Sequence, residues 1–195
     1  GVESASTVQT QAFQLWSTKG AAELGWEFDE NSVAGCYVEP LDTYCDMSHL
    51  IGVEDWQPED GTRTIGYFCG VLDEVEGETP AHATDRAKRN AIDFVERDLA
   101  QLWPDAAGKG GFDWNVLVDR DRRSGPTRFD SQYWRANVTP WERYVLTPAG
   151  SVEHRLPAGD SGFANLKLAG DWTRTGIDGG CVEAAVISGM QAARA

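Results

Sequence analysis

The 195-residue chain is poor in basic residues: 17 lysines and arginines stand against 31 acidic residues, for a formal net charge of -14. No run of lysine or arginine forms the basic stripe that binding to a nucleic acid backbone requires. No apolar run approaches the roughly 20 residues needed to cross a bilayer. The first residues, GVESASTVQTQ, lack the basic and then apolar pattern of a signal peptide. These absences argue against nucleic acid as a partner and against a membrane span, and they predict a cytoplasmic protein.

Residues that bind metals or form disulfides are few and scattered. The four cysteines lie far apart and form no C-x-x-C pair: Cys36, Cys45, Cys69 and Cys181. No two histidines lie close together, so neither a metal site nor a Ser-His-Asp triad has support in the spacing. In a chain of this length, buried free thiols are expected rather than a disulfide framework. The sequence therefore identifies no catalytic residue and no metal ligand.

The sequence also lacks the loop Gly-x-Gly-x-x-Gly that follows a strand in dinucleotide-binding folds. This absence conflicts with the end of the chain, NLKLAGDWTRTGIDGGCVEAAVISGMQAAR (residues 165–194), whose layout usually serves a nucleotide cofactor. That stretch predicts a short buried strand over 165–170, a Gly-Asp turn, and a helix that starts near Gly179. If a nucleotide binds here, the phosphate loop must come from elsewhere.

Hydrophobic patterns predict mixed α and β structure for the rest of the chain. Helical spacing of apolar residues predicts a short amphipathic helix over 5–16. Segments rich in β-branched and aromatic residues predict strands over 33–39, 64–72 and 112–119. One or two helical turns are expected in DMSHLIGVEDW, which lies between the first two strands.

Two longer helices are predicted. Thr79-Pro80 forms a good cap and first-turn pair for a helix that ends at Trp103-Pro104. Its expected buried face consists of Ala87, Ala91, Val95, Leu99 and Leu102. The expected packed face of the last helix consists of Val182, Ala185, Val186, Gly189 and Ala193. Between these helices, the segment 131–156 mixes aromatics with prolines, which indicates irregular connections around a ligand.

The terminal segment can bind a cofactor through two features. Gly170 allows close approach because it has no Cβ, and Asp171 places a carboxylate where it can accept a hydrogen bond from a hydroxyl. Gly179 and Gly180 then open a helix whose unpaired N–H groups and partial positive charge favour an anionic atom. The alternative is an ordinary strand-turn-helix unit in which Asp171 only forms the turn.

The full terminal string resembles the carboxy-terminal FAD-binding signature of the flavin amine oxidase and phytoene desaturase superfamily. That signature has a strand like N-L-x-L-A-G-D-W and a helix like G-x-x-E-G-A-x-x-S-G-x-x-A-A. The matching residues are Asn165, Leu166, Leu168, Ala169, Gly170, Asp171, Trp172, Glu183, Ala185, Ser188, Gly189, Ala192 and Ala193. The resemblance implies an FAD-dependent oxidoreductase that acts on a small-molecule substrate.

The resemblance also implies roles for particular residues. The cofactor-binding set is Gly170, Asp171, Trp172, Gly179, Gly180, Cys181 and Val182. Within it, Gly170 and Asp171 would hold the ribityl-pyrophosphate, and the helix-start amides from Gly180 to Val182 would face N1 and O2 of the flavin. Three aromatic residues are candidates for the substrate cavity: Trp134, Trp141 and Tyr144.

In this superfamily the FAD-binding domain is discontinuous, and its phosphate loop lies at the amino end of the protein. The chain is therefore expected to be mixed α/β: the carboxy-terminal part of a Rossmann-like FAD domain plus a strand-rich substrate domain. Residues 1–159 would be mostly substrate domain, with the first 20 or so near the FAD domain, and 160–195 would be the FAD-binding strand-turn-helix. The partner would be the polypeptide that carries the amino-terminal dinucleotide-binding half, either another chain or a missing segment. The chain would accordingly be a cleavage product, a separate subunit or a truncation.

Several alternatives remain open at this point. Amine oxidases commonly have an aromatic residue where this chain has Cys181, so the sequence is closer to the desaturase and hydroxysqualene dehydroxylase branch. Cys181 is expected to be a small packed thiol, and a covalent flavin link is the alternative. The reaction would be oxidation of an amine or amino acid, or desaturation of an organic substrate. A non-catalytic scaffold module that keeps a relic of the flavin fold is the rival function.

Overall fold

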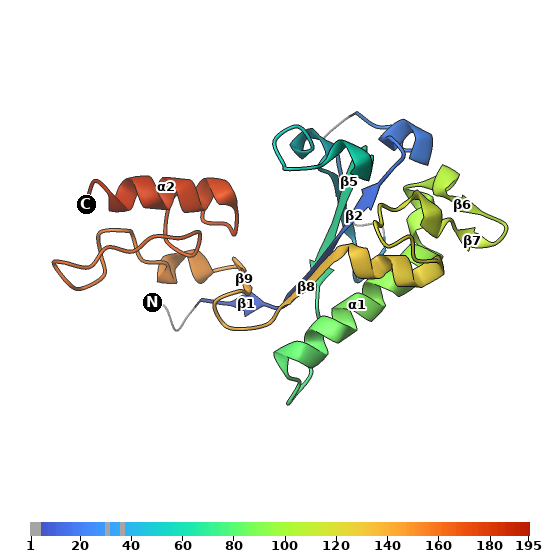
Figure 1. Ribbon diagram of the computed structural model, residues 1–195. Helices are drawn as coiled ribbons and strands as arrows, with labels where there is room; N and C mark the ends of the chain where they lie inside the picture. Colours follow the sequence, from blue (N-terminus) through green and yellow to red (C-terminus); the bar gives the residue numbers. More distant parts are fainter. Residues whose placement is uncertain (1–4, 30–31, 36–37) are drawn as a thin grey trace. The chain divides into compact units, whose positions relative to one another are not determined.

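The computed structural model describes residues 5–29, 32–35 and 38–195, and the chain divides into two compact units. One unit consists of Thr10–Val138, and the other joins the residues up to Gln9 to Thr139–Ala195. Both α and β elements are present, as the sequence predicts (Figure 1). The strand pairs among the described residues are all antiparallel.

The larger unit is built on a five-stranded antiparallel sheet with the order β3-β4-β5-β2-β8. Its strands are β2 (Thr10–Ser17), β3 (Val33–Ala34), β4 (Thr43–Asp46), β5 (Thr64–Val71) and β8 (Tyr133–Asn137). The strand predicted over 64–72 is confirmed. Of the strand predicted over 33–39, the first two residues form β3, and residues 36–37 lie outside the described part of the chain.

The helix predicted over 5–16 is wrong, because this segment forms β1 (Thr7–Val8) and β2. Phe13 and Leu15 alternate along β2 and are fully buried, whereas the Trp16 side chain is half-buried. Phe13 lies opposite Phe68 of β5, and the two rings stack with centroids 4.5 Å apart. The apolar residues fit both periodicities, and pairing with β5 and β8 on its two sides decides for the strand.

Helix α1 (Pro80–Arg97) packs on one face of this sheet, and its start is as predicted. The Thr79 hydroxyl accepts a hydrogen bond from the His82 amide at 3.3 Å, and Pro80 occupies the first turn. The helix ends at Arg97, earlier than predicted, and a 3-10 turn over Leu99–Gln101 follows. The predicted apolar face is confirmed as buried: Ala87, Ala91, Val95, Leu99 and Leu102.

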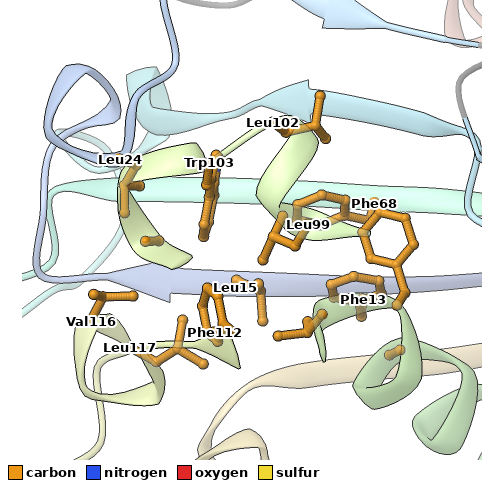
Figure 2. Close-up of a cluster of buried hydrophobic side chains, with 14 of the residues drawn as sticks. Phe13, Leu15, Leu24, Phe68, Leu99, Leu102, Trp103, Phe112, Val116 and Leu117 are labelled. Atoms are coloured by element: carbon orange, nitrogen blue, oxygen red, sulfur yellow. The ribbon is translucent and has the colours of Figure 1, made fainter. Parts of the chain in front are cut away.

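Aromatic side chains fill the space between α1 and the sheet (Figure 2). The Trp103 indole N–H donates to the Tyr44 hydroxyl at 3.3 Å, which satisfies both buried groups, and burial raises the pKa of Tyr44 well above its usual range. The chain passes so close to β5 that a Cβ on Gly70 would lie 1.8 Å from the carbonyl oxygen of Pro40. Only glycine fits at that position.

The strand predicted over 112–119 is largely wrong. Here β7 (Gly111–Phe112) forms a short hairpin with β6 (Ala107–Gly108), a 3-10 turn over Trp114–Val116 follows, and Leu117 forms an isolated antiparallel bridge with Ser17. Trp114, Val116, Leu117 and Val118 are all buried, but the 3-10 turn interrupts the extended backbone that a continuous strand needs. The remaining 3-10 turns are Ala21–Leu24, Ser48–Leu50, Pro58–Asp60, Pro104–Ala106, Gly125–Ser131 and Ser151–His154. The turn at Ser48–Leu50 confirms the predicted helical turn.

In the smaller unit, β1 pairs with β9 (Tyr144–Val145), and the chain ends in α2 (Val182–Ala192). The buried strand predicted over 165–170 is wrong, because these residues form no strand and are mostly exposed. An apolar strand needs neighbours on both sides, and the described residues of this unit offer none to this segment.

The predicted packed face of α2 is also wrong. The side chains of Ala184 and Ser188 are fully buried, whereas Val182, Val186 and Met190 are 75%, 56% and 51% exposed. The helix therefore turns small residues toward the loop of its own unit. Val182 and Val186, which the sequence assigns to a packed face, are therefore exposed to solvent in the described chain.

Candidate functional site

The Gly-Asp turn is held in place through its backbone. The Gly170 amide donates to the Ser188 hydroxyl of α2 at 3.0 Å, and the Gly170 carbonyl accepts from the Thr173 hydroxyl at 2.9 Å. The Thr173 and Ser188 hydroxyl oxygens are 2.6 Å apart, and both residues are fully buried. Because the single Thr173 proton is given to Gly170, Ser188 donates to Thr173. Every proton of this small network is therefore used.

Glycine is required at position 170 for two reasons. Its φ is +132°, a conformation that other residues rarely adopt. A Cβ added there would also lie 2.6 Å from the Trp172 ring. The close approach of Trp172 to the Gly170 backbone thus depends on the glycine.

A buried arginine ties this turn to two other segments. The Arg155 guanidinium donates to the Asp171 carbonyl at 2.6 Å and to the Thr147 hydroxyl at 2.7 Å. Thr147 in turn donates to the Asp178 carbonyl at 2.6 Å. Arg155 is only 7% exposed, and no carboxylate lies within ion-pair distance of it in the part of the chain that the structure describes. Its donors therefore serve neutral backbone and hydroxyl acceptors, and its charge is not balanced.

The carboxylate of Asp171 has no hydrogen-bond or ion-pair partner among residues 5–29, 32–35 and 38–195, although its own carbonyl is bound by Arg155. The residue is half-buried, at the edge of the unit. The Asp171 carboxylate is therefore able to accept a hydrogen bond from solvent or from a bound molecule.

The second predicted feature, the start of α2, is positioned by Asp178 and Tyr144. Asp178 has a left-handed φ of 55°, and its carboxylate accepts from the amide of Thr175 at 2.8 Å. The Tyr144 hydroxyl donates to the Gly180 carbonyl. A Cβ on Gly180 would lie 2.8 Å from the Tyr144 ring, so glycine permits this contact.

The amides at the beginning of α2 are free to bind a ligand. Cys181 is the N-cap, and its sulfur accepts from the Ala184 amide at 3.5 Å. Within the described chain, the N–H groups of Gly179, Gly180, Cys181 and Val182 have no acceptor. Such amides, together with the partial positive charge of the helix N-terminus, stabilise an electron-rich atom.

The structure brings the predicted cofactor residues into one unit but does not place all the predicted substrate residues with them. Tyr144 contacts Gly180, and Trp141 belongs to the same unit but is 83% exposed. Trp134 lies on β8 of the other unit. Its ring centroid is 5.5 Å from that of Phe129, and the Lys88 ammonium lies 4.5 Å from the Trp134 ring centroid. The role of these three aromatic residues in a substrate cavity stays a prediction.

The cysteines are free where the structure describes them. Cys45, Cys69 and Cys181 are half-buried rather than buried, which corrects the expectation, and Cys36 lies outside the described residues. Burial raises the pKa of both Cys45 and Cys69, so these thiols are mainly protonated near neutral pH. In the ranges described, no three His, Cys, Asp or Glu residues are grouped so as to hold a metal ion.

Sequence reasoning missed the residues that support the site. Arg155 and Thr173 hold the Gly-Asp turn, and Thr147 links Arg155 to the Asp178 carbonyl. None of these residues carries a spacing signal of its own. Ser188 was visible only as a match to the terminal signature, without a role. The clearest available signal was Arg155 itself, an isolated basic residue directly before the apolar segment Leu156-Pro157-Ala158.

The same unit thus contains a fixed Gly-Asp turn with a free carboxylate and a helix start with free amides, two groups that are able to contact the polar parts of a ligand. The sequence model of the family described as flavin containing amine oxidoreductase matches residues 75–195, more than half of the chain. The chain belongs to this family, whose members are flavin oxidoreductases. No curated protein and no solved structure matches it. Among the described helices, none has the length and apolar character needed to span a membrane.

Proposed function

We propose that this chain is the carboxy-terminal part of an FAD-dependent oxidoreductase and that it completes the flavin site and part of the substrate cavity. The observation that carries the proposal is the Asp171 turn. Its backbone is fixed by Ser188, Thr173 and Arg155, while its carboxylate has no partner among the described residues. A residue that only formed the turn would be expected to use its side chain to stabilise that turn, as Asp178 does here.

The residues fit a flavin in two places. Asp171 would accept a hydrogen bond from a hydroxyl of the ribityl or ribose chain, with Gly170 and Trp172 forming the close backbone approach. The amides from Gly179 to Val182 would meet the electron-rich edge of the ring. When bound, the flavin would supply the acceptor for a hydride. The amides and partial positive charge of the helix start would favour an electron-rich atom of the ring.

The exposed apolar strip on α2 supports a partner for this unit. Val182, Val186 and Met190 follow one another at helical spacing and are each more than half exposed. Leu166, in the segment predicted to be a strand, is 47% exposed. We propose that the polypeptide with the amino-terminal dinucleotide-binding half covers this strip.

The substrate remains at the level of a class. Tyr144, held against Gly180, would place its exposed ring next to the flavin site. Cys181 stands where an aromatic residue would complete a cage around an amine. Both oxidation of an amine or amino acid and desaturation of a less polar organic substrate therefore stay within the proposal.

Purification of the native assembly that contains this chain tests the function. We expect a yellow complex that releases FAD on denaturation. Its intact mass should reveal a second polypeptide segment, and the sequence of that segment should contain Gly-x-Gly-x-x-Gly. A complete assembly that stays colourless and takes up no FAD would contradict the proposal and favour a scaffold role.

A further inference from the structure

An arginine-rich loop stands out in this acidic chain. Four arginines occur within nine residues of the larger unit: Arg120, Arg122, Arg123 and Arg128. The loop lies between the 3-10 turn at Trp114–Val116 and β8, and it contains the 3-10 turn at Gly125–Ser131. None of these residues belongs to the candidate flavin site.

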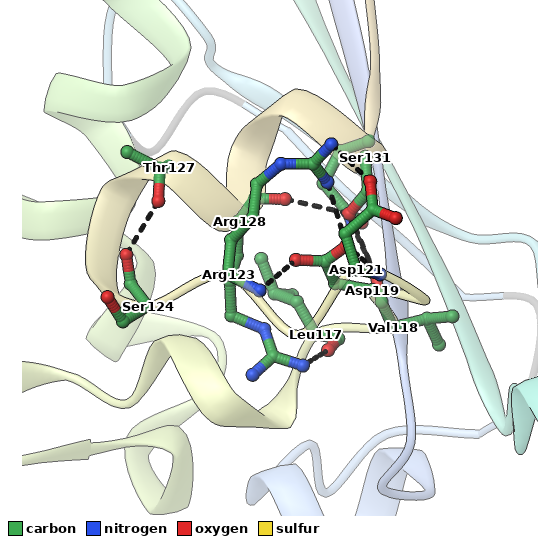
Figure 3. Close-up of polar contacts among 10 residues, drawn as sticks. Leu117, Val118, Asp119, Asp121, Arg123, Ser124, Thr127, Arg128 and Ser131 are labelled. Atoms are coloured by element: carbon green, nitrogen blue, oxygen red, sulfur yellow. Dashed lines mark hydrogen bonds and ion pairs between the residues drawn. The ribbon is translucent and has the colours of Figure 1, made fainter.

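Two of the four arginines are neutralised by carboxylates. Arg120 forms a two-pronged ion pair with Asp60, with N···O distances of 2.6 and 2.7 Å. Arg123 donates to Asp119 at 2.8 Å and to Asp121 at 2.5 Å (Figure 3). The side chains of Asp60 and Asp119 are 2% and 0% exposed, so these pairs are part of the packed structure.

Arg128 is held in place without a carboxylate. Its guanidinium donates to the Leu117 carbonyl at 2.9 Å (Figure 3). It also donates to the Asn115 side-chain oxygen at 3.2 Å. Its Nε is buried and has no acceptor in the described chain. A half-buried guanidinium with an orphan donor and an unbalanced charge is costly unless an anion approaches it.

Arg122 is presented to solvent by a strained backbone. Its φ of 52° is left-handed, which is unfavourable for an arginine. The buried Asp119 carboxylate causes this conformation, because it accepts from the amides on either side, Asp121 at 3.0 Å and Arg123 at 2.7 Å. The Arg122 side chain is exposed and has no partner in the described chain. Strain of this kind is found where a side chain must be aimed at a ligand.

Both unbalanced arginines line the same open hollow, which has a volume of about 670 Å³. Its charged lining consists of the four arginines and the carboxylates of Glu59, Asp60 and Asp119, of which the two aspartates are already paired with arginines. Thr18, Asn115 and Ser124 add neutral polar groups to the wall. The lining therefore carries four guanidinium groups against three carboxylates, and Asp121, which is not in the lining, is bound to Arg123. The chain as a whole carries a charge of -14.

We propose that this hollow binds the phosphate group of a small molecule between Arg122 and Arg128. A phosphate dianion offsets two guanidinium charges at once, and each planar guanidinium can donate to two of its oxygens. The ligand can be free phosphate or a phosphate ester. An adjoining hollow of about 350 Å³ is lined by Trp16 and Trp56, which gives an aromatic ester a second contact.

Isothermal titration of the full chain with inorganic phosphate and with phenyl phosphate, in a low-salt buffer free of other polyvalent anions, tests the proposal. We expect both ligands to bind, and Arg122→Gln to weaken both about fivefold, as for an exposed charge contact. Arg128→Lys, which keeps the charge but loses the planar fork, should weaken both as well. Tighter binding of phenyl phosphate would identify an ester as the ligand, and equal binding would identify free phosphate.

Two controls make the outcome decisive. Arg89→Gln removes an exposed arginine of α1 that lies outside the hollow, and it should leave binding unchanged. Asp171→Ala should leave it unchanged as well, so failure of the flavin proposal and failure of this one are distinguishable. No millimolar binding by the folded wild type, or equal losses in Arg122→Gln and Arg89→Gln, would overturn the phosphate site.

Discussion

At the scale of single residues, the site combines fully used side chains with one unused side chain. The turn is hydrogen-bonded by the side chains of Ser188, Thr173 and Arg155. The Asp171 carboxylate, in contrast, has no partner among the described residues. Removal of a used side chain should therefore change folding stability, and removal of the unused one should change ligand binding. The two kinds of residue can be separated by measurement.

Asp171→Ala should weaken FAD binding in the complete assembly by about ten- to a hundredfold, or roughly 1.5 to 3 kcal/mol, because a charged acceptor is lost. Asp171→Asn should weaken it less, since the amide oxygen still accepts. Titration gives the dissociation constants, and flavin-free melting temperatures should not change. Asp160→Ala, at an exposed acid of the same unit, is the control. Unchanged FAD affinity in Asp171→Ala would leave this residue only a turn-forming role.

Arg155→Met should lower the free energy of unfolding by about 1 to 3 kcal/mol, because the buried carbonyl of Asp171 and the hydroxyl of Thr147 lose their donor. Arg155→Lys should lower it less, since one ammonium can still donate to some of these acceptors. Urea denaturation measures both. Arg174→Met, at an exposed arginine of the same unit, should have little effect. If both methionine variants were equally stable, the hydrogen bonds of Arg155 would not contribute to the stability of the fold.

At the scale of elements, α2 is docked on its loop by small and polar residues. Ala184 and Ser188 form the buried face, and Ser188 joins the helix to Gly170 and Thr173. The branched residues of α2 project from the opposite side. One face of this helix therefore packs on its own unit, and the other face is exposed and available to a partner.

Ser188→Ala should destabilise the smaller unit by about 1 to 3 kcal/mol, because the Gly170 amide loses its acceptor and the Thr173 hydroxyl loses a donor. Met190→Ala, on the exposed side of the same helix, should be neutral in the isolated chain. Thermal unfolding followed by circular dichroism distinguishes them. An equal fall in both melting temperatures would mean that the hydrogen bonds of Ser188 add nothing to the packing.

The elements that could be predicted from the sequence are those with strong local signals. Thr79-Pro80 sets the start of α1, and the β-branched and aromatic run at 64–71 makes β5. The segment at Phe13 and Leu15 fits helix and strand equally, and only its partners on the sheet decide. The apolar character of Trp114 to Val118 favours a strand, but the first three of these residues form a 3-10 turn.

The candidate site could be predicted only in part, for a related reason. The glycines and Asp171 form a local string, so the sequence identifies them before any folding is known. Arg155 and Thr147 reach the turn from distant positions, and only tertiary structure brings them there. The strand expected over 165–170 depends on neighbours that the described chain does not supply.

At the scale of the whole molecule, buried ion pairs make the free energy of unfolding of the larger unit depend on pH. Hydrogen bonds from Arg120 lower the pKa of Asp60 below its usual value. An acid with a lowered folded-state pKa contributes stability that is fully present above the unfolded pKa of about 3.9 and is lost as the pH falls through the folded value. The contribution of this pair therefore disappears in the acid range.

Denaturant unfolding at a series of pH values between about 6 and 2.5 measures this contribution. We expect the wild type to be more stable than Asp60→Asn near pH 6 and the difference to shrink as the pH falls below about 4. Asp85→Asn, at an exposed aspartate of α1, should match the wild type throughout. A difference between wild type and Asp60→Asn that did not vary with pH would show that the ionised form of Asp60 is not what stabilises the fold.

The two units together carry only part of what a flavin nucleotide needs. The candidate site offers the Asp171 carboxylate and a few helix-start amides, and the sequence has no glycine-rich phosphate loop. Submicromolar affinity requires more than about 8 kcal/mol of net binding free energy, whereas each charge-assisted hydrogen bond contributes about 1.5 to 3 kcal/mol before the entropy cost of association. We therefore expect the isolated chain to bind FAD no more tightly than the micromolar range. Fluorescence titration of the isolated chain measures this affinity, with Asp171→Ala as the control for specific binding. Submicromolar binding that Asp171→Ala abolished would contradict the need for a dinucleotide-binding partner, because the chain would then hold the cofactor through its own groups.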